Sequence, residues 1–276
     1  MTIEVGLLGP MVAVHAGVPV DLGSTSRRVV LAALLMADGR VVATDELVDM
    51  IWPSDPPRTA LSKLQGHVCA LRKALRAAGV PDPTRYVVTT APGYLVPRGA
   101  MQTDLAAFVE VVDGARSSAG AGRLDEAAER YGRALDIVRG PALADLGAAR
   151  TLLAADMLTE QVLAVVEAKA EIDVQRGRAA DALEIATRAL RAHPFRDRLH
   201  ELSIHALVEL GRPTDAIRSY RRCRDLYRAE LGIEPSEAVR RLVDAILSET
   251  VMSRAGAVRA AVVTPRPAHP RTELRL

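Results

Sequence analysis

The chain has 276 residues, of which 49% are hydrophobic and 25% are charged, so it is long enough to form two domains with buried cores. Aromatic residues make up only 3% of the chain, which argues against a platform that stacks the bases of single-stranded nucleic acid. The net charge is only +2, but residues 58–98 form a basic block with seven Lys and Arg and one acid. This block indicates an anionic partner, and DNA is the first candidate. The alternative is a basic face that is simply solvated.

The first part of the chain predicts a small sheet followed by two helices. Residues 3–8 and 11–14 read as short strands joined by Gly and Pro turns. Residues 26–37 are an apolar run that predicts a buried helix, and Gly39 ends it. Thr44 can cap the next helix, whose first turn carries two acids where the helix dipole favours negative charge.

A third helix is expected from Arg58 to about Ala78, after the turn PSDPP. Residues 86–90 and 94–96 flank Ala-Pro-Gly and predict a β-hairpin. The second helix, the turn and the third helix then form a helix-turn-helix, and the hairpin forms a wing. In this arrangement the last helix lies in the major groove while the helix before it crosses the DNA backbone.

The third helix has two different faces. Leu64, Val68, Leu71 and Leu75 repeat at the spacing of a core-facing stripe, with Leu61 just ahead of them. The opposite face is small and basic and has no acid; it consists of Ser62, Gly66, Cys69 and Ala70, edged by Arg58, Lys63, Lys73 and Arg76. Because the major groove is about 12 Å wide, small central residues permit close approach while the basic edges reach phosphates.

From residue 102 the pattern becomes helical and repetitive. Three segments begin with Gly-Arg, at Gly122, Gly177 and Gly211, and each has an acid four residues and an Ala five residues further on. The last two lie 34 residues apart, which is the tetratricopeptide period. The sequence therefore predicts an all-α, tetratricopeptide-like helical-repeat domain over 102–250, with one longer helix at about 149–175. A generic helical bundle is the alternative.

The remaining features concern location. Cys69 and Cys223 are far apart in sequence and read as free thiols in a reducing compartment. The start of the chain does not resemble a signal peptide, and its longest apolar run, 29–37, is too short to span a bilayer. Residues 251–276 combine Pro and Arg without an apolar period, so we expect a disordered basic tail. Together these features favour a cytoplasmic protein that does not contact membranes.

Catalytic motifs are absent from the sequence. It has no phosphate-binding loop, no Gly-x-Ser-x-Gly elbow and no dinucleotide fingerprint. The six His do not pair with Cys or with each other at metal-ligand spacing. We therefore expect no enzyme activity, no cofactor and no metal.

Several blocks in the right order resemble a known family. The stretches GLLGP, TDELVDMIWPSDPPRTALSKLQGHVCALRKAL and YVVTTAPGYLV resemble an OmpR/PhoB-type winged helix. RGPALADL, HPFRDRLHELSIHAL and LGIEPSEAVRRL resemble a bacterial transcriptional activation domain, also called BTAD. Together they resemble the SARP (Streptomyces antibiotic regulatory protein; AfsR/DnrI/RedD) family. The implied fold is an α+β winged helix-turn-helix domain at 1–98 followed by the activation domain at 102–250.

The resemblance implies a sequence-specific, DNA-binding activator of transcription. Such a protein binds direct repeats in the promoter of a secondary-metabolite, usually antibiotic, biosynthetic gene cluster and recruits RNA polymerase holoenzyme through its sigma factor region. Direct repeats imply head-to-tail neighbours, so a homodimer on the DNA is expected. A protein-binding scaffold and a regulator gated by a small molecule are the other hypotheses.

The resemblance also assigns site residues. HVCALRK matches the winged-helix pattern in which His67, Arg72 and Lys73 contact phosphates. Lys63, Gly66 and Cys69 fall where that class reads base edges, and Lys63 and Gln65 are the side chains suited to direct readout. The full set expected on the recognition helix is Arg58, Thr59, Ser62, Lys63, Gln65, Gly66, His67, Cys69, Arg72, Lys73 and Arg76; the wing contributes Arg85 and Thr90.

Each assignment has a plainer alternative. Thr90 stands where many relatives have Arg, so Arg85 or Arg98 would have to supply a cation to the minor groove. His67 can flank the core stripe, and Cys69 can be a passive small residue rather than a redox sensor. The basic residues can be solvated, with Arg58 engaged by the preceding turn.

Overall fold

A computed structural model describes residues 2–148 and 155–248 of the chain. It divides into two compact units, Met1–Ile172 and Asp173–Leu276, and the division falls inside one helix, α7 (Ala155–Gln175). The tail expected to be disordered and the expected start of the long helix near residue 149 lie outside the described residues. Each unit is described by itself.

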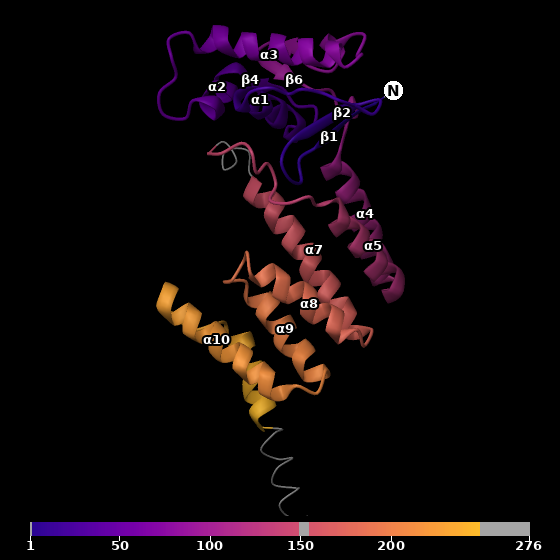
Figure 1. Ribbon diagram of the computed structural model, residues 1–276, viewed down its shortest axis with the longest axis vertical. Helices are drawn as coiled ribbons and strands as arrows, with labels where there is room; N and C mark the ends of the chain where they lie inside the picture. Colours follow the sequence, from indigo (N-terminus) through magenta and orange to yellow (C-terminus); the bar gives the residue numbers. More distant parts are fainter. Residues whose placement is uncertain (1, 149–154, 249–276) are drawn as a thin grey trace, which may run out of the picture. The chain divides into compact units, whose positions relative to one another are not determined.

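The first unit begins with a four-stranded sheet (Figure 1). Its order is β3-β2-β1-β7, built from β1 (Ile3–Gly6), β2 (Val12–His15), β3 (Val18–Pro19) and β7 (Met101–Thr103). β1 and β2 overlap the two strands predicted at 3–8 and 11–14, and β1, β2 and β3 are antiparallel to one another in turn. β7 runs parallel to β1, and Ile3 pairs with Met101. Sequence reasoning missed β7, because three residues are too few to show an alternation of apolar and polar side chains.

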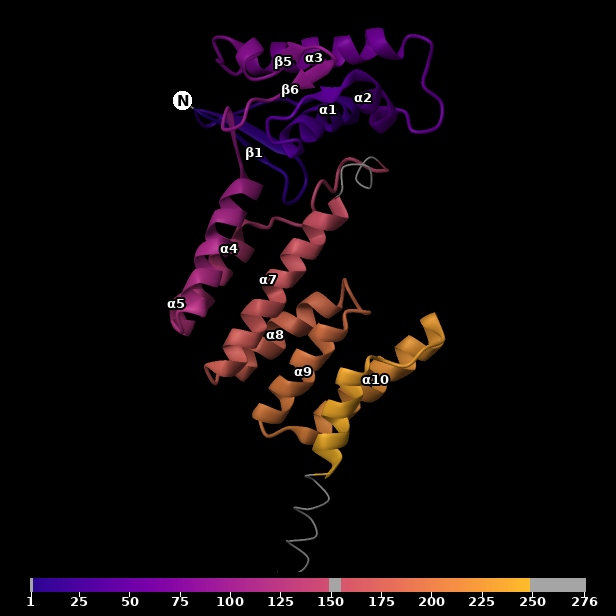
Figure 2. The same cartoon turned by 180° about the vertical axis from the view of Figure 1, so that it is seen from behind.

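The predicted winged helix follows and is confirmed. Helices α1 (Thr25–Met36), α2 (Thr44–Ile51) and α3 (Ala60–Ala77) pack together, and a second sheet of order β4-β6-β5 adjoins them. Its strands are β4 (Val42–Ala43), β5 (Val88–Thr90) and β6 (Gly93–Leu95). One continuous core joins α1, α3 and the sheets, with Leu34, Leu47 and Leu64 fully buried. α3 lies at the outer edge of this unit in both views (Figures 1 and 2).

The rest of the described chain is helical, as predicted. α4 (Asp104–Gly120) packs on α5 (Leu124–Ile137) in the first unit. In the second unit α8 (Ala179–Leu190) packs on α9 (Asp197–Glu209), which packs on α10 (Pro213–Leu231). A further helix begins at residue 237.

The three Gly-Arg signals mark three turns of the same construction. Gly122, Gly177 and Gly211 all adopt the left-handed conformation, with φ of +73°, +70° and +69°, which glycine reaches without a steric penalty. Each amide and the one after it donate to carbonyls of the preceding helix, as Gly122 N does to Ala119 O and Arg123 N does to Ser118 O. This is the Schellman pattern that ends a helix.

The residues after each glycine repeat as well. The arginine pairs with the acid three residues further on, and the Nε to carboxylate distances are 2.7, 2.9 and 2.9 Å for Arg123–Glu126, Arg178–Asp181 and Arg212–Asp215. The alanine that follows is fully buried in all three cases. The repeat inferred from the sequence therefore has a physical basis: glycine ends one helix, an ion pair supports the start of the next, and alanine permits close packing.

The first unit ties its winged helix to α4 and to the segment after α5. The carboxylate of Asp104 accepts hydrogen bonds from the amides of Leu7 and Leu8, at 2.6 and 3.0 Å, and from Arg139 Nη2 at 3.2 Å. Asp145 accepts a hydrogen bond from the amide of Met11 at 2.8 Å and forms an ion pair with Arg28 of α1.

We call this set of contacts the junction. It consists of Asp104, Arg139 and Asp145 together with Leu7, Leu8, Met11 and Arg28.

Apolar side chains cross the same junction. Leu143 and Leu146, from the RGPALADL segment, pack in the winged-helix core, while Leu8 packs in the core of α4 and α5. The winged helix, α4, α5 and the segment after α5 therefore belong to one compact unit that ends at Ile172. The expected boundary between a winged-helix domain that ends at residue 98 and an activation domain that begins at residue 102 stays a prediction.

Candidate nucleic-acid interface

The inner face of α3 is a stripe of buried side chains. Leu64, Val68, Leu71 and Leu75 are buried as the spacing predicts. The stripe continues at its start with Ala60, four residues before Leu64, and not with Leu61, whose side chain is 52% exposed. The expectation that Leu61 leads the core stripe is therefore wrong, because a helical period of 3.6 residues places it to one side.

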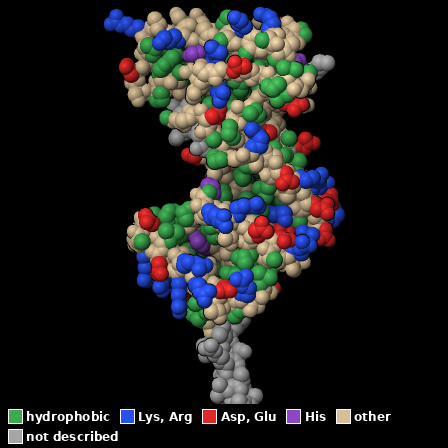
Figure 3. Space-filling view, viewed as in Figure 1, with side chains coloured by type: hydrophobic (Ala, Val, Ile, Leu, Met, Phe, Trp, Pro, Cys, Tyr) green, Lys and Arg blue, Asp and Glu red, His purple; other side chains and the backbone are tan. Residues whose placement is uncertain are grey.

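The outer face of α3 is exposed over its length. The exposed residues are Arg58, Thr59, Ser62, Lys63, Gln65, Gly66, Cys69, Lys73 and Arg76, so the expected recognition residues, apart from His67 and Arg72, share one surface. Within residues 2–148 and 155–248, Arg58, Lys63, Lys73 and Arg76 form no ion pair. In Figure 3 basic side chains are spaced along α3 with uncharged surface between them. Unneutralised cations beside small side chains suit a polyanion that approaches closely.

His67 is half-buried at the edge of this face, next to Trp52 at the end of α2, with a ring-centroid distance of 6.2 Å. Burial lowers the pKa of the His67 imidazole below 6.5, and the positive charges of Arg27 and Lys63 lower it further. The lowered pKa favours the neutral ring, which can donate one N–H to a phosphate without adding charge.

Arg72 has a different position from the one expected. Its Nε and Nη2 atoms donate to the carbonyl oxygen of Val87 at 2.9 and 2.6 Å, and Nη2 also donates to Thr89 Oγ1 at 2.7 Å. The guanidinium thus fastens α3 to the first strand of the wing. Phosphate contact by Arg72 was inferred from its place in the HVCALRK pattern; the geometry instead supports a positioning role.

The wing is a two-residue hairpin between β5 and β6, in which Thr90 pairs with Gly93. It is joined to the helix-turn-helix by Thr44, at the start of α2, whose amide and hydroxyl both donate to the carbonyl of Pro92 at 3.2 and 2.9 Å. Thr90 is half-buried. These bonds make the hairpin and the two helices one rigid surface.

Of the two arginines that could give the wing a charge, Arg98 is engaged in an ion pair with Asp38. Arg85 is highly exposed and lies 3.8 Å from Asp82. The pKa of the Asp82 carboxyl is lowered, chiefly by a hydrogen bond from the Thr84 side chain and less by Arg85 and Arg76. Arg85 is thus the more available cation near the wing.

Two residues near α3 were missed by sequence reasoning. Leu61 presents an exposed apolar side chain beside Ser62 and Gln65, and an apolar side chain at that place can contact the methyl group of thymine. Arg27, on α1, lies close enough to His67 to lower its pKa, so it adds positive potential behind the recognition helix. Arg27 is forty residues away in sequence, where no local signal connects the two.

Other features of the described chain bear on the remaining expectations. Both cysteines are free, as expected; Cys69 is exposed, and burial raises the pKa of the Cys223 thiol to about 12. Within the described ranges no three His, Cys, Asp or Glu side chains are placed to hold a metal ion together. None of the helices that the structure describes combines the length and apolar composition needed to cross a membrane.

Comparison with known families matches most of the chain. Residues 17–96 match the C-terminal domain of transcriptional regulatory proteins, and residues 103–247 match the bacterial transcriptional activator domain. The regulatory protein DnrI of Streptomyces peucetius is 32% identical over 249 residues, which are 88% of this chain and 92% of DnrI. The regulatory protein AfsR of Streptomyces coelicolor is 34% identical over 268 residues, which are 95% of this chain but only 26% of AfsR.

A solved structure is also similar. EmbR from Mycobacterium tuberculosis, in complex with a low affinity phosphopeptide, superposes with a TM-score of 0.81 at 31% sequence identity. The match covers 94% of this chain and 70% of the EmbR chain. The winged helix followed by a helical domain is therefore an arrangement shared with a transcriptional regulatory protein.

Proposed function

Because the chain belongs to the SARP family of transcriptional regulators, we propose that it binds double-stranded promoter DNA through α3 and the wing and activates transcription from that position. The observation that carries this proposal is the outer face of α3. Its four cations, which form no ion pair with any residue that the structure describes, flank small side chains, and the face stands next to a hairpin fixed in place by Arg72 and Thr44. The proposal includes no catalytic step.

Within this surface the residues fall into two groups. Lys73 and Arg76 lie in the C-terminal half of α3 and Arg58 precedes it, where long side chains reach phosphates on either side of a groove. Lys63, Gln65 and Leu61 lie in the N-terminal half, which in helix-turn-helix proteins contacts base edges. Gly66 and Cys69 offer no strong hydrogen bond to a base, so sequence-dependent DNA shape adds to recognition.

Lys73→Ala tests the phosphate assignment. We expect weaker binding to every duplex, with the slope of log affinity against log salt reduced by about one unit, because one fewer counterion is released. The measurement is fluorescence anisotropy with a promoter fragment and an unrelated duplex at several salt concentrations. Arg133→Ala is the matched control, since Arg133 on α5 is exposed and forms no ion pair within the described residues. An unchanged slope would remove Lys73 from the phosphate contacts; salt-independent or absent binding by the unmodified protein would favour a protein-binding scaffold instead.

Gly66→Ala tests the fit of α3 in the groove. No atom lies within 4 Å of an added Cβ at Gly66, so alanine should stabilise the helix by up to about 1 kcal/mol. The same methyl group would project from the face proposed to approach DNA, so affinity should fall severalfold while the melting temperature rises. Gly120→Ala, in equally open space at the end of α4, should leave DNA affinity unchanged. Unaltered affinity of Gly66→Ala would mean that this face does not press against DNA.

The finer assignments rest on the family resemblance. We propose direct repeats as the target, with a second copy bound head-to-tail, and contact with RNA polymerase holoenzyme in its sigma factor region. We also propose that the regulated genes form an antibiotic or other secondary-metabolite cluster and that the protein acts in the cytoplasm. Selection of bound sequences from a random DNA library tests the repeats: recovery of single, unrepeated sites would contradict head-to-tail binding.

A further inference from the structure

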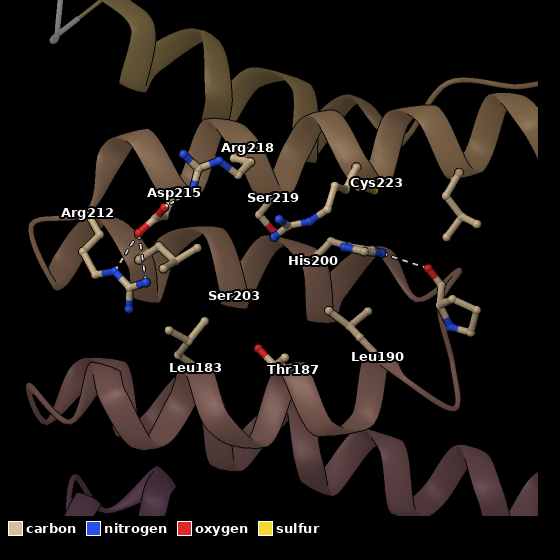
Figure 4. A pocket seen from close by; sticks show the side chains of 14 residues that line it. Leu183, Thr187, Leu190, His200, Ser203, Arg212, Asp215, Arg218, Ser219 and Cys223 are labelled. Carbon is tan, nitrogen blue, oxygen red and sulfur yellow. Dashed lines mark hydrogen bonds and ion pairs between the residues drawn. The ribbon is translucent and has the colours of Figure 1, made fainter.

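A groove in the second unit lies between α8, α9 and α10 and has a volume of about 500 Å³ (Figure 4). α8 contributes Leu183, Thr187 and Leu190, which are spaced to share one face of that helix. In Figure 4 these side chains point towards Ser219 and Cys223 on α10, with His200 and Ser203 of α9 between them. The groove is unrelated to the α3 surface and lies in a different compact unit.

Arginines dominate the charge of this groove. Three arginines line the groove, Arg212, Arg218 and Arg222. Asp215 supplies the single carboxylate among the lining residues. Asp215 is already shared: Arg212 donates to one of its oxygens at 2.9 Å and Arg218 to the other at 2.7 Å. Within residues 2–148 and 155–248, Arg222 has neither a hydrogen bond nor an ion pair. The groove therefore holds an excess of positive charge with one guanidinium uncommitted.

The rest of the lining is apolar or carries hydroxyl groups. Leu190, Leu207 and Leu226 provide apolar surface, and Thr187, Ser203 and Ser219 provide hydroxyls that can both donate and accept hydrogen bonds. His200 is only 8% exposed, and its Nε2 lies 2.8 Å from the carbonyl of Pro194. Because a carbonyl oxygen only accepts, Nε2 is the donor in this bond, and Nδ1 has no hydrogen-bond partner in the described structure.

We propose that this groove binds an acidic, leucine-containing segment of another protein in an extended conformation. A guanidinium presents several N–H donors in a plane and binds carboxylates in two-point contacts, so Arg222 can hold an Asp or Glu side chain. The leucines accept an apolar side chain, and the hydroxyls face the peptide amides and carbonyls. Recognition of acidic segments by arginine clusters is a common mode of peptide binding.

Charge also argues against one occupant, the C-terminal segment of this chain itself. Residues 251–276 carry five Arg and one Glu, so they have the same sign as the groove and would be repelled. An acidic segment is attracted, and the attraction extends along α10, whose basic side chains are all arginines and belong to the blue surface in Figure 3. The proposal does not depend on DNA binding by α3.

The test measures binding of the full chain to an array of short fluorescent peptides. Each peptide carries Glu or Asp together with Leu, and the spacing between the acidic residue and Leu varies across the array. The control array replaces each acid by its amide. We expect saturable, salt-sensitive binding of a subset of the acidic peptides and none of their amide counterparts. Arg222→Glu should weaken the bound peptides at least tenfold.

Arg221→Glu is the matched control, because Arg221 adjoins Arg222 on α10, is exposed and forms no ion pair within the described residues, but does not line the groove. It should retain most of the affinity, and both variants should unfold and bind DNA as the unmodified protein does.

Equal losses of peptide affinity in the two variants would reduce the site to a non-specific basic surface. Displacement of the peptide by free glutamate or inorganic phosphate at low concentration would overturn a peptide site in favour of a small anion, and displacement by duplex DNA would assign the groove to DNA. Absence of binding across the array would also overturn the proposal.

Discussion

Replacing Gly93 with Ala is expected to destabilise the winged helix by on the order of 3 kcal/mol and to abolish DNA binding with it. Gly93 is buried in β6, opposite Ala43 of β4. A Cβ added there would lie 1.9 Å from the carbonyl oxygen of Val42 and 2.9 Å from the Cα of Ala43. Both are backbone atoms, so no side-chain rotation can relieve the clash and the strands must separate.

The effect on function follows from what β4 and β6 connect. β4 leads directly into α2, and β6 is the second strand of the wing. Separating them also strains the two hydrogen bonds from Thr44 to Pro92. The hairpin and the recognition helix would then lose their fixed relation, and a surface that must match DNA at both places would no longer bind it.

Urea unfolding followed by the fluorescence of Trp52, the single tryptophan of the chain, is the measurement. Trp52 ends α2 and lies beside His67 of α3, so its signal reports on the winged helix rather than on the second unit. Gly120→Ala provides the control, since its added Cβ meets no atom within 4 Å. A Gly93→Ala protein that unfolds within about 0.5 kcal/mol of the unmodified one would show that the strands can adjust, and the argument for a rigid wing would fail.

Replacing Asp104 with Ala is expected to destabilise the first unit by about 3 kcal/mol, because it leaves two buried amides without an acceptor. Its side chain is 15% exposed and binds the amides of Leu7 and Leu8 together with Arg139. Leu7 and Leu8 are almost fully buried, so water does not readily replace the carboxylate. Unfolding monitored at Trp52 should therefore shift, although Asp104 lies outside the helix-turn-helix.

Asp113→Ala on the same helix is the matched control. Asp113 pairs with Arg116 at the surface, where both side chains are 63% exposed, and such pairs contribute little. We expect a change of less than about 0.5 kcal/mol. Equal effects of the two substitutions would mean that the junction stabilises the winged helix no more than a surface ion pair does. A loss in Asp104→Ala alone would show that the N-terminal sheet and α4 fold as one unit.

Much of the fold could be predicted from local sequence signals. The stripe of Leu64, Val68, Leu71 and Leu75 predicted both the helix α3 and its buried face, since side chains at this spacing can only share one side of a helix. The three Gly-Arg segments predicted a helical repeat, and in the structure each glycine ends a helix in a left-handed turn, a conformation that strongly favours glycine. The helical spacing also predicted the small, basic, acid-free outer face of α3. The role of its residues on DNA remains a prediction.

Long-range contacts could not be predicted in this manner. Arg72 matches a phosphate-binding pattern, but the fold brings the carbonyl of Val87 within reach of its guanidinium. β7 is recognisable only beside β1, nearly one hundred residues earlier in the chain. The junction joins Leu7 to Asp104 and Met11 to Asp145 through backbone amides, whose availability depends on the path of the chain and not on residue type.

The sequence by itself thus determined where helices begin and end and which side of each is apolar, because those properties depend on neighbours within a few residues. Only the tertiary structure decided which polar groups are committed inside the protein and which stay free for a partner. Arg72 and Asp104 are committed, while Lys73 and Arg222 have no partner among the residues that the structure describes. The physical reason is that a charged side chain is available for binding only when folding has not already supplied it with a partner, and that depends on residues distant in sequence.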